Sequence, residues 1–458
     1  MKVQQSEFLS HNGSILDVLK VALPLILSSS CHAVNMFFDR LMLTRYSPEA
    51  SAAGFTGGLT HFTLSCLLFG MVSYTGTFVA QYSGAGKYHR IGITVWQGIF
   101  LALAGGLLLM TGIWWGPGLF ALFKHDPVVT VQEVAYFQVL SGGTFVFLLN
   151  AAVCSFWSGR GKTTVVLMLA LIITFFNIPL NYMLIYGRFG LPELGTPGAA
   201  LGTVLAEFFG VLIGMILFIR KSSRRKYLTL NCRPDWDLLR RMLRYGMPNG
   251  VQLALDLIAF NLFSILLGCY GVTVHEASSI TFGINNIAFC PIMGMGQAAA
   301  ILVGQAIGAK DIPLARKSVK NTCVLVMIYS ALMIVLFSGM QEIVLAPFVR
   351  PGDAGQLETM RIARWMLHFL SLYLLFDGAN ITFSNVLRGA GDTGFTMWTL
   401  AVVGIGCFAL PCLVFFLLGA PWWVLWALLC WEILLLCVIY VWRYRQGKWT
   451  RMQVVENN

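Results

Sequence analysis

The chain has 458 residues, of which 57% are hydrophobic and only 11% charged, and its formal net charge is +11. Soluble domains carry about a quarter charged residues, so this composition excludes an ordinary water-soluble protein and predicts an integral membrane protein built of many helices. The 11 cysteines are scattered and contain no C-x-x-C pair, so we interpret them as small apolar residues and not as disulfides or metal ligands.

Twelve apolar stretches are long enough to cross a bilayer as helices, which requires about 20 residues each. In chain order the expected spans are residues 15–43, 51–80, 92–123, 131–157, 163–187, 197–220, 241–268, 277–308, 317–346, 357–387, 395–418 and 421–443. Because their number is even, both termini are predicted to lie on the same side of the membrane.

The positive charges indicate which side that is. Of the 31 Lys and Arg residues, 24 fall on the side of the termini and the even-numbered loops. Since cytoplasmic loops are enriched in Lys and Arg, we expect both termini to be cytoplasmic. The basic loop at 220–226 and the absence of a targeting segment favour the inner (plasma) membrane of a bacterium. The charge is thus explained by topology, and no nucleic-acid partner is expected.

The two halves of the chain resemble each other. The longest polar break, 220–244, separates six spans from six, and VAQYSGAGK (79–87) recurs as VGQAIGAKD (303–311) at an offset of 224 residues. Pro24 and Pro248 share that offset. Chance recurrence of Gly and Ala is the alternative, but four identities at one offset disfavour it.

The repeat predicts two lobes of six helices. We expect an N-lobe at 14–220, a basic cytoplasmic linker at 221–240 and a C-lobe at 241–446. An even number of spans per repeat gives both repeats the same orientation in the membrane. Parallel repeats of this kind are typical of transporters that work by alternating access, with the binding site at the interface of the repeats.

Three acids, Asp39, Asp256 and Asp377, lie inside the predicted spans. A charged side chain at the centre of a membrane helix costs roughly 2.5–3.5 kcal/mol on insertion scales, so such residues usually face a bundle interior or a wet cavity. We therefore predict that these three carboxylates bind the coupling cation, either a proton or a metal ion.

Polar side chains accompany the acids on the same or neighbouring spans. The candidates for lining a cation or substrate site are Asn35, Asn177, Asn181, Gln252 and Asn380. Carboxylate and amide oxygens are the ligands that a hard cation such as Na⁺ requires, and Na⁺ is considered at Asp256 and Asp377. For the amides, hydrogen bonding between helices is the alternative role.

Two further acids, Glu207 and Glu432, occupy matching places in the sixth and twelfth spans. We interpret them as possible secondary acids of the site, with a purely structural role as the alternative.

No enzyme is predicted. The segment FWSGRGKT (156–163) ends like a phosphate-binding loop, but Phe156 stands where the first glycine belongs. No cofactor is expected other than Na⁺ or H⁺ as coupling ion.

The whole chain resembles the MATE (multidrug and toxic compound extrusion) transporters, in particular their NorM-like branch. The residues that carry the resemblance are Pro24 with Asp39, VAQYSGAG (79–86), NIPLNYMLIYG (177–187) with GTPGAALGT (195–203), GMPNGVQLALD (246–256), VGQAIGAKD (303–311), and Asp377 with LRGAGDT (387–393).

The resemblance implies an all-α membrane protein with twelve helices in two pseudo-symmetric six-helix lobes around a central cleft. It also implies an antiporter that exchanges Na⁺ or H⁺ for organic cations. The expected partners are a small cationic amphipathic substrate and membrane lipid, and we expect a monomer. The substrate itself and the choice between Na⁺ and H⁺ stay open.

The resemblance assigns roles to individual residues. Asp39 matches the N-lobe acid, with Asn177 and Asn181 beside it, and Asp377 matches the C-lobe acid. Asp256 stands where NorM-like members usually carry Glu, so its carboxylate reaches one methylene less far. Asn181 stands where an archaeal branch has an acid.

A flippase for a lipid-linked sugar or another lipid, from the same superfamily, is the alternative function. Such a protein would need a basic cavity for phosphate, whereas the charges inside these spans are acidic. A channel or receptor is disfavoured because neither requires an internal repeat.

Overall fold

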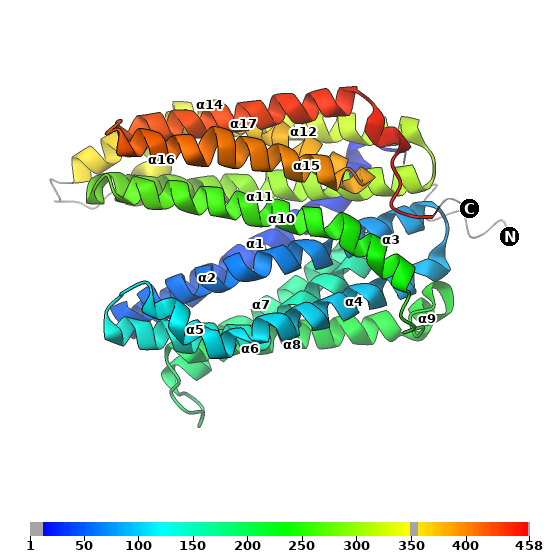
Figure 1. Ribbon diagram of the computed structural model, residues 1–458, viewed down its shortest axis with the longest axis horizontal. Helices are drawn as coiled ribbons and strands as arrows, with labels where there is room; N and C mark the ends of the chain where they lie inside the picture. The colour runs from blue at the N-terminus through cyan, green and yellow to red at the C-terminus, as the bar shows by residue number, and fades with distance from the viewer. Residues whose placement is uncertain (1–11, 349–355, 457–458) are drawn as a thin grey trace. The chain divides into compact units, whose positions relative to one another are not determined.

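The computed structural model describes residues 12–348 and 356–456, and all the regular elements of this part of the chain are helices (Figure 1). The long helices are α1 (Ile15–Tyr46), α2 (Pro48–Ser73), α3 (Thr75–Gly84), α4 (Tyr88–Met110), α5 (Gly112–Ala121), α6 (Pro127–Ser158), α7 (Thr163–Tyr186), α8 (Thr196–Ile219), α10 (Trp236–Gly268), α11 (Val272–Gly308), α12 (Ile312–Gly339), α14 (Gln356–Ala390), α15 (Thr393–Leu400), α16 (Leu410–Leu417) and α17 (Trp422–Arg445). The short elements are α9 (Lys221–Tyr227), α13 (Gln341–Leu345), η1 (Ala346–Phe348), η2 (Ala401–Ala409) and η3 (Lys448–Arg451).

Twelve helices or continuous helical runs in the described residues are long and apolar enough to cross a membrane. The predicted all-α fold with twelve spans is therefore confirmed. Two of the spans are composite, because α2 continues into α3 and α15 continues through η2 into α16.

Several predicted span boundaries were wrong by a helical turn or more. The third predicted span, 92–123, is divided at Thr111, where α4 ends and α5 begins. The ninth, 317–346, is divided at Met340, after which the short α13 follows. Around Thr111 the residues are apolar or small, so hydropathy gives little sign of the first division, whereas polar Gln341 and Glu342 follow directly after Met340 at the second.

The chain forms two compact units. Unit 1 contains the described residues of Met1–Ile26, Val251–Ile307 and Asp311–Gln453, and unit 2 contains those of Leu27–Gly250, Gly308–Lys310 and Val454–Asn458. The first helix of each half thus contributes to both units. The two division points, after Ile26 in α1 and after Gly250 in α10, are 224 residues apart, the same offset that relates the sequence repeats.

In unit 2, α6 is the central helix and packs against α2, α4 and α8, while α7 covers α8 (Figure 1). At one end of α6 the ring of Phe156 meets the edge of Phe218, with centroids 4.8 Å apart, and of Tyr227, at 5.4 Å. Edge-to-face contacts of this kind add about 0.5–1.5 kcal/mol each beyond the burial of the rings.

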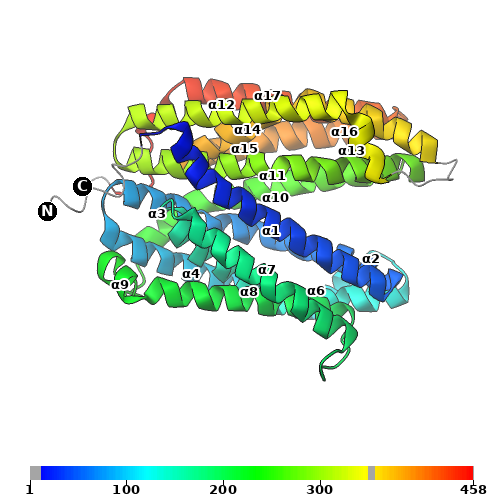
Figure 2. The ribbon, with the colours of Figure 1, turned by 180° about the vertical axis from the view of Figure 1, so that it is seen from behind.

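In unit 1, α14 packs against both α12 and α17, and the three helices can be followed in Figure 2. The core of this unit contains a stacked pair, Phe282 and Trp426, whose ring centroids are 5.2 Å apart. Phe263 meets the same tryptophan edge-on at 5.9 Å. These rings join α10, α11 and α17.

The helical run from α15 to α16 contains the π-helical segment η2, Ala401–Ala409. A π-helical segment has a wider turn than the α-helix, is rare, and frequently occurs at functional sites. The π-helical segment was not predicted from the sequence, because hydropathy is the same for an α- and a π-helical turn.

Close contact between α2 and α10 in unit 2 depends on glycine. A Cβ atom at Gly250 would lie 2.1 Å from the carbonyl oxygen of Leu67, and one at Gly70 would lie 2.7 Å from the Cα of Gly250. Small residues at such crossings let helix backbones approach closely in membranes.

We expect Gly250→Ala to lower the melting temperature of the purified protein by several degrees, because the overpacked crossing costs about 1–3 kcal/mol. The matched control is Gly283→Ala in α11, where an added Cβ meets nothing within 4 Å and alanine favours the helix. Thermal denaturation in detergent compares the two variants. Equal melting temperatures would show that the crossing relaxes without cost.

Candidate functional site

In unit 2 a polar cluster surrounds Asp39 on α1. Its Oδ1 accepts a hydrogen bond from Asn181 Nδ2 on α7, and its Oδ2 accepts one from Thr203 Oγ1 on α8 at 3.5 Å. Asn177 Nδ2 donates to the same threonine oxygen at 3.2 Å. Two neighbouring helices, α7 and α8, therefore direct polar side chains at the carboxylate of α1.

Local sequence explains why these groups converge. Pro179 lies between Asn177 and Asn181 in α7, where it removes a backbone hydrogen bond from the helix interior. On α8, a Cβ atom at Gly202 would lie 2.0 Å from Asn181 Oδ1, so only glycine permits this approach. The next residue, Thr203, then reaches both Asn177 and Asp39.

Two amide oxygens of this region have no hydrogen-bond donor among the described residues. They are Asn35 Oδ1, one turn before Asp39 on the same helix, and Asn181 Oδ1. Buried polar atoms nearly always have a hydrogen-bond partner. A buried acceptor without a donor in the protein is therefore a candidate ligand for an ion or a water molecule. With the carboxylate of Asp39, these oxygens form a ligand set suited to a small hard cation.

Arg40 follows Asp39 but does not neutralise it. Its guanidinium lies over the ring of Phe55, 4.9 Å from the centroid, and forms no salt bridge with Asp39 in the described part of the chain. Neighbouring positions on a helix point about 100° apart, which separates the two side chains. The negative charge of Asp39 is therefore left for another cation.

Unit 1 contains a second acidic cluster. Asp377 on α14 is 8% exposed, and its Oδ1 accepts a hydrogen bond from Asn380 Nδ2 at 3.3 Å. On the same helix the Ser384 hydroxyl accepts one from Gln252 Nε2 of α10, at 3.3 Å. Gln252 Oε1 has no donor among the described residues.

Three carboxylates belong to this second cluster. Asp377 interacts electrostatically with Asp256 of α10, and Glu432 of α17, which is 6% exposed, interacts with both. Asp256 is exposed, and the charge of Arg388 also acts on it. Three acids with one basic neighbour repel one another unless a cation or proton is shared among them.

The π-helical segment η2 lies directly against Glu432. A Cβ atom at Gly404 would be 3.1 Å from Glu432 Oε1, so the wide turn and its glycine accommodate the carboxylate. The association of a π-helical turn with a buried acid agrees with the usual occurrence of such turns at functional sites.

The structure thus brings together most of the side chains that the sequence singled out. Asp39, Asn177 and Asn181 share one cluster, whereas Asp256, Asp377 and Glu432 share the other. Glu207 makes no hydrogen bond to Asp39 in the described residues and lies one helical turn beyond Thr203.

Two contributors were missed. Thr203 is the last residue of the GTPGAALGT motif, so the motif contained the signal although the role of its threonine was not seen. Gly404 could have been noticed only as a glycine in a very apolar span, which is a weak signal.

The same family model matches both halves of the chain. Residues 24–183 and 248–412 match the MatE family. The two matches begin 224 residues apart, at Pro24 and Pro248.

Curated relatives cover nearly the whole chain. It is 24% identical over 423 residues to a protein from Idiomarina loihiensis described as "Probable multidrug resistance protein NorM", covering 91% of this chain and 88% of that one. It is 27% identical over 396 residues to "Multidrug resistance protein PmpM" of Pseudomonas aeruginosa, covering 86% and 82%.

A solved structure described as the outward-facing conformation of a multidrug resistance MATE family transporter of the MOP superfamily has a TM-score of 0.85 and 17% identity. The comparison covers 98% of this chain and 99% of that one, and it supports the fold. Since the family matches at residues 24–183 and 248–412 span most of the sequence, the chain belongs to the MatE family.

Proposed function

We propose that this chain exports organic cations across the inner membrane of a bacterium, in exchange for Na⁺ or H⁺, by alternating access of its two halves. The observation that carries the proposal is the pair of acidic clusters, one around Asp39 and one around Asp377, in the two halves of a repeated membrane protein. The description of bacterial relatives as multidrug resistance proteins supports the substrate class.

A charged side chain inside a membrane is energetically costly. A carboxylate there is retained only where it serves a function or has a partner. Asp39 has amide and hydroxyl partners but no basic one in the described residues, and Asp377 lies among other acids. Both clusters are therefore suited to gain and lose a cation.

A drug cation and a coupling cation would compete for the same carboxylates. The substrate would be held by negative charge and by aromatic faces, which attract cations, and 13% of the residues are aromatic. Arrival of Na⁺ or H⁺ from the outside would then neutralise an aspartate and release the substrate.

Stoichiometry decides which force drives export. Exchange of one monovalent cation for another moves no net charge, so the membrane potential contributes nothing. Exchange of two for one would add about 2.3 kcal/mol per 100 mV. The single-cation scheme depends on the ion gradient alone.

The test is transport of a fluorescent lipophilic cation by the purified protein in liposomes, with Na⁺ and pH gradients imposed separately. Transport driven by one gradient and not by the other would support an antiporter and identify its ion. If neither gradient drives transport of several cations while a fluorescent lipid crosses the bilayer, the chain is a lipid flippase and the proposal is wrong.

A further inference from the structure

The segment that follows α17 and η3 is held against unit 2 by polar contacts. We call Met452–Glu456 the tail segment; its residues Val454, Val455 and Glu456 belong to unit 2. The backbone N–H of Val454 donates to Gln81 Oε1 at 2.9 Å, and its carbonyl accepts from Arg241 Nη1 at 3.3 Å. Lys87 Nζ donates to the backbone carbonyl of Glu456 at 3.0 Å.

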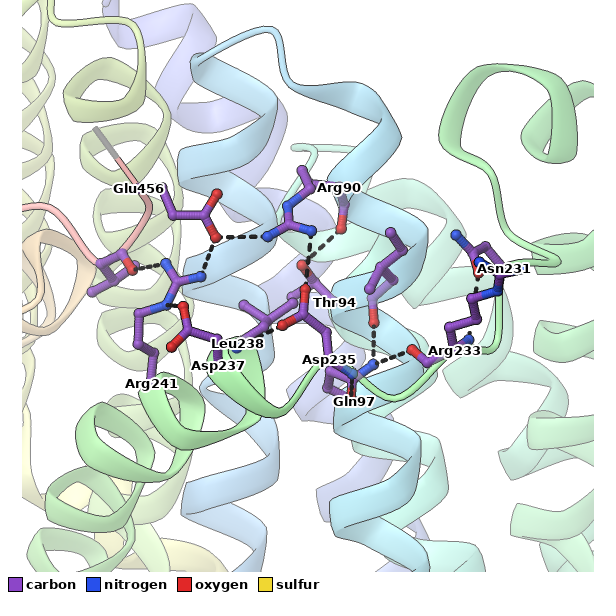
Figure 3. Close-up of polar contacts among 12 residues, drawn as sticks. Arg90, Thr94, Gln97, Asn231, Arg233, Asp235, Asp237, Leu238, Arg241 and Glu456 are labelled. Atoms are coloured by element: carbon purple, nitrogen blue, oxygen red, sulfur yellow. Dashed lines mark hydrogen bonds and ion pairs between the residues drawn. The ribbon is translucent and has the colours of Figure 1, made fainter. Parts of the chain in front are cut away.

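The carboxylate of Glu456 is shared by two arginines, as Figure 3 shows. Arg90 Nη2 donates to its Oε1 at 2.6 Å, and Arg241 Nη2 donates to the same oxygen. Arg90 also holds Asp235 Oδ2 at 3.0 Å, which fixes the guanidinium in place. Charge-assisted bonds of this kind are among the strongest in proteins.

Burial accompanies these bonds. Val454 is 2% exposed and Val455 is 6% exposed, and both belong to the apolar core of unit 2 together with Tyr82, Leu238 and Met242. The tail segment therefore has two apolar anchors followed by an acidic one, and unit 2 supplies apolar core residues for the first two and basic side chains for the third.

The receiving residues come from three separate elements. Gln81 lies in α3, Arg90 in α4 and Arg241 in α10, and all three bond the backbone or the carboxylate of the tail segment. Gln81 belongs to the repeated motif VAQYSGAGK, which the transport scheme leaves without a role. A hydrogen bond between a side-chain amide and the backbone of another segment, like that of Gln81, is typical of peptide recognition.

We propose that Gln81, Lys87, Arg90 and Arg241 form a peptide-binding site on unit 2 whose ligand is an acidic Val-Val-Glu segment, supplied by residues 454–456 of the same chain. The site lies apart from the Asp39 cluster, with which it shares no hydrogen bond in the described residues. Docking of the tail segment fastens α3, α4 and the start of α10 to one another.

The test uses a variant that lacks residues 454–458 and a fluorescein-labelled peptide with the sequence of residues 450–458. The labelled peptide should bind the truncated protein, measured by fluorescence anisotropy, and should bind the full chain at least about tenfold more weakly, because a tethered segment competes at millimolar effective concentration. A peptide with glutamine in place of Glu456 should bind the truncated protein more weakly.

The melting temperature provides a second measurement of docking. The truncated variant should melt roughly 4–8 °C below the full chain, and saturating peptide should restore most of the loss. Glu456→Gln in the full chain should reproduce part of it. Asp237→Asn is the matched control, since Asp237 faces the same Arg241 at 4.0 Å but its side chain is 87% exposed. We expect no shift for this control.

Two results would overturn the proposal. If truncation leaves the melting temperature unchanged and no peptide binds, the tail segment has no site. If truncation destabilises the protein but the peptide neither binds nor restores stability, the segment is a fixed part of the core and not the ligand of a separable site. Neither outcome depends on whether the chain exports cations.

Acid should release the segment. Burial opposes ionisation of Glu456, but hydrogen bonds and charges from Arg90 and Arg241 outweigh it, so its pKa is lowered from the ordinary value. A lowered pKa stabilises the docked form above the ordinary value for Glu, about 4.3, and that stabilisation is lost as the pH falls through the lowered pKa.

The melting-temperature difference between the full chain and Glu456→Gln should therefore be constant near neutral pH and disappear below about pH 4. The charged and titratable groups that face Glu456 from the packed elements are Tyr82, Lys87, Arg90, Asp235, Asp237 and Arg241. If this melting-temperature difference instead grows as the pH falls, Glu456 is not held by ion pairs with Arg90 and Arg241.

Discussion

Replacement of Asp39 by asparagine is expected to slow cation export at least about tenfold, the loss that corresponds to roughly 1.4 kcal/mol of ion-binding energy. Asparagine has nearly the same shape, and its Oδ1 accepts from Asn181 just as the carboxylate does. The substitution therefore removes the charge and leaves the hydrogen-bond geometry in place. The measurement is the initial rate of gradient-driven transport in liposomes.

Two controls separate charge from folding. Glu49→Gln removes an exposed carboxylate from the first turn of α2 and should leave transport unchanged. Asp39→Glu keeps a titratable group but moves it by one methylene, so an intermediate rate is expected. Full transport by Asp39→Asn, at normal protein amounts, would remove this acid from the coupling scheme.

The second large effect is expected at Asp377. Asp377→Asn should also lower transport at least about tenfold, yet it should raise the melting temperature or leave it unchanged. The reason is that Asp256 and Glu432 repel a charge at this position, so neutralising it relieves like-charge repulsion. Functional sites often retain such destabilising groups.

Glu358→Gln, on the same helix but with a side chain 60% exposed, is the matched control for this experiment. It should change neither transport nor stability. If Asp377→Asn instead lowers the melting temperature by several degrees, the carboxylate supports the fold through bonds such as that from Asn380. The loss of transport in Asp377→Asn would then be caused by unfolding and not by loss of the coupling cation's binding site.

Much of the fold could be predicted from the sequence because the membrane restricts the choices. Runs of about 20 apolar residues have to be helices in a bilayer, so their number was correct. The division at Thr111 could not be predicted, because the residues around it are apolar or small, whereas polar Gln341 and Glu342 after Met340 were a signal for the second division.

The candidate site was predictable where a charge in an apolar span stood out. Asp39, Asp256 and Asp377 were identifiable for that reason, and helical spacing placed Asn35 beside Asp39. Thr203 and Gly404 contribute through contacts between helices distant in sequence, which no spacing rule reveals.

The tail segment illustrates a different limit. Val454, Val455 and Glu456 form an ordinary polar-apolar stretch, and their receptor is assembled from α3, α4 and α10. Arg90 and Arg241 are 151 residues apart in the chain, and only the three-dimensional structure shows that both bind the carboxylate of Glu456.

If a drug cation and the coupling ion compete for the same carboxylates, binding of the drug should release the ion, and a measurement of this release is the sharpest test of the competition. A lipophilic cation would be added to the purified protein in weakly buffered solution while released protons, or displaced ²²Na⁺, are counted. We expect release of about one cation per bound substrate in the electroneutral scheme, and a reduced release in Asp39→Asn and Asp377→Asn. Tight substrate binding that releases neither ion, and that both variants retain unchanged, would contradict it.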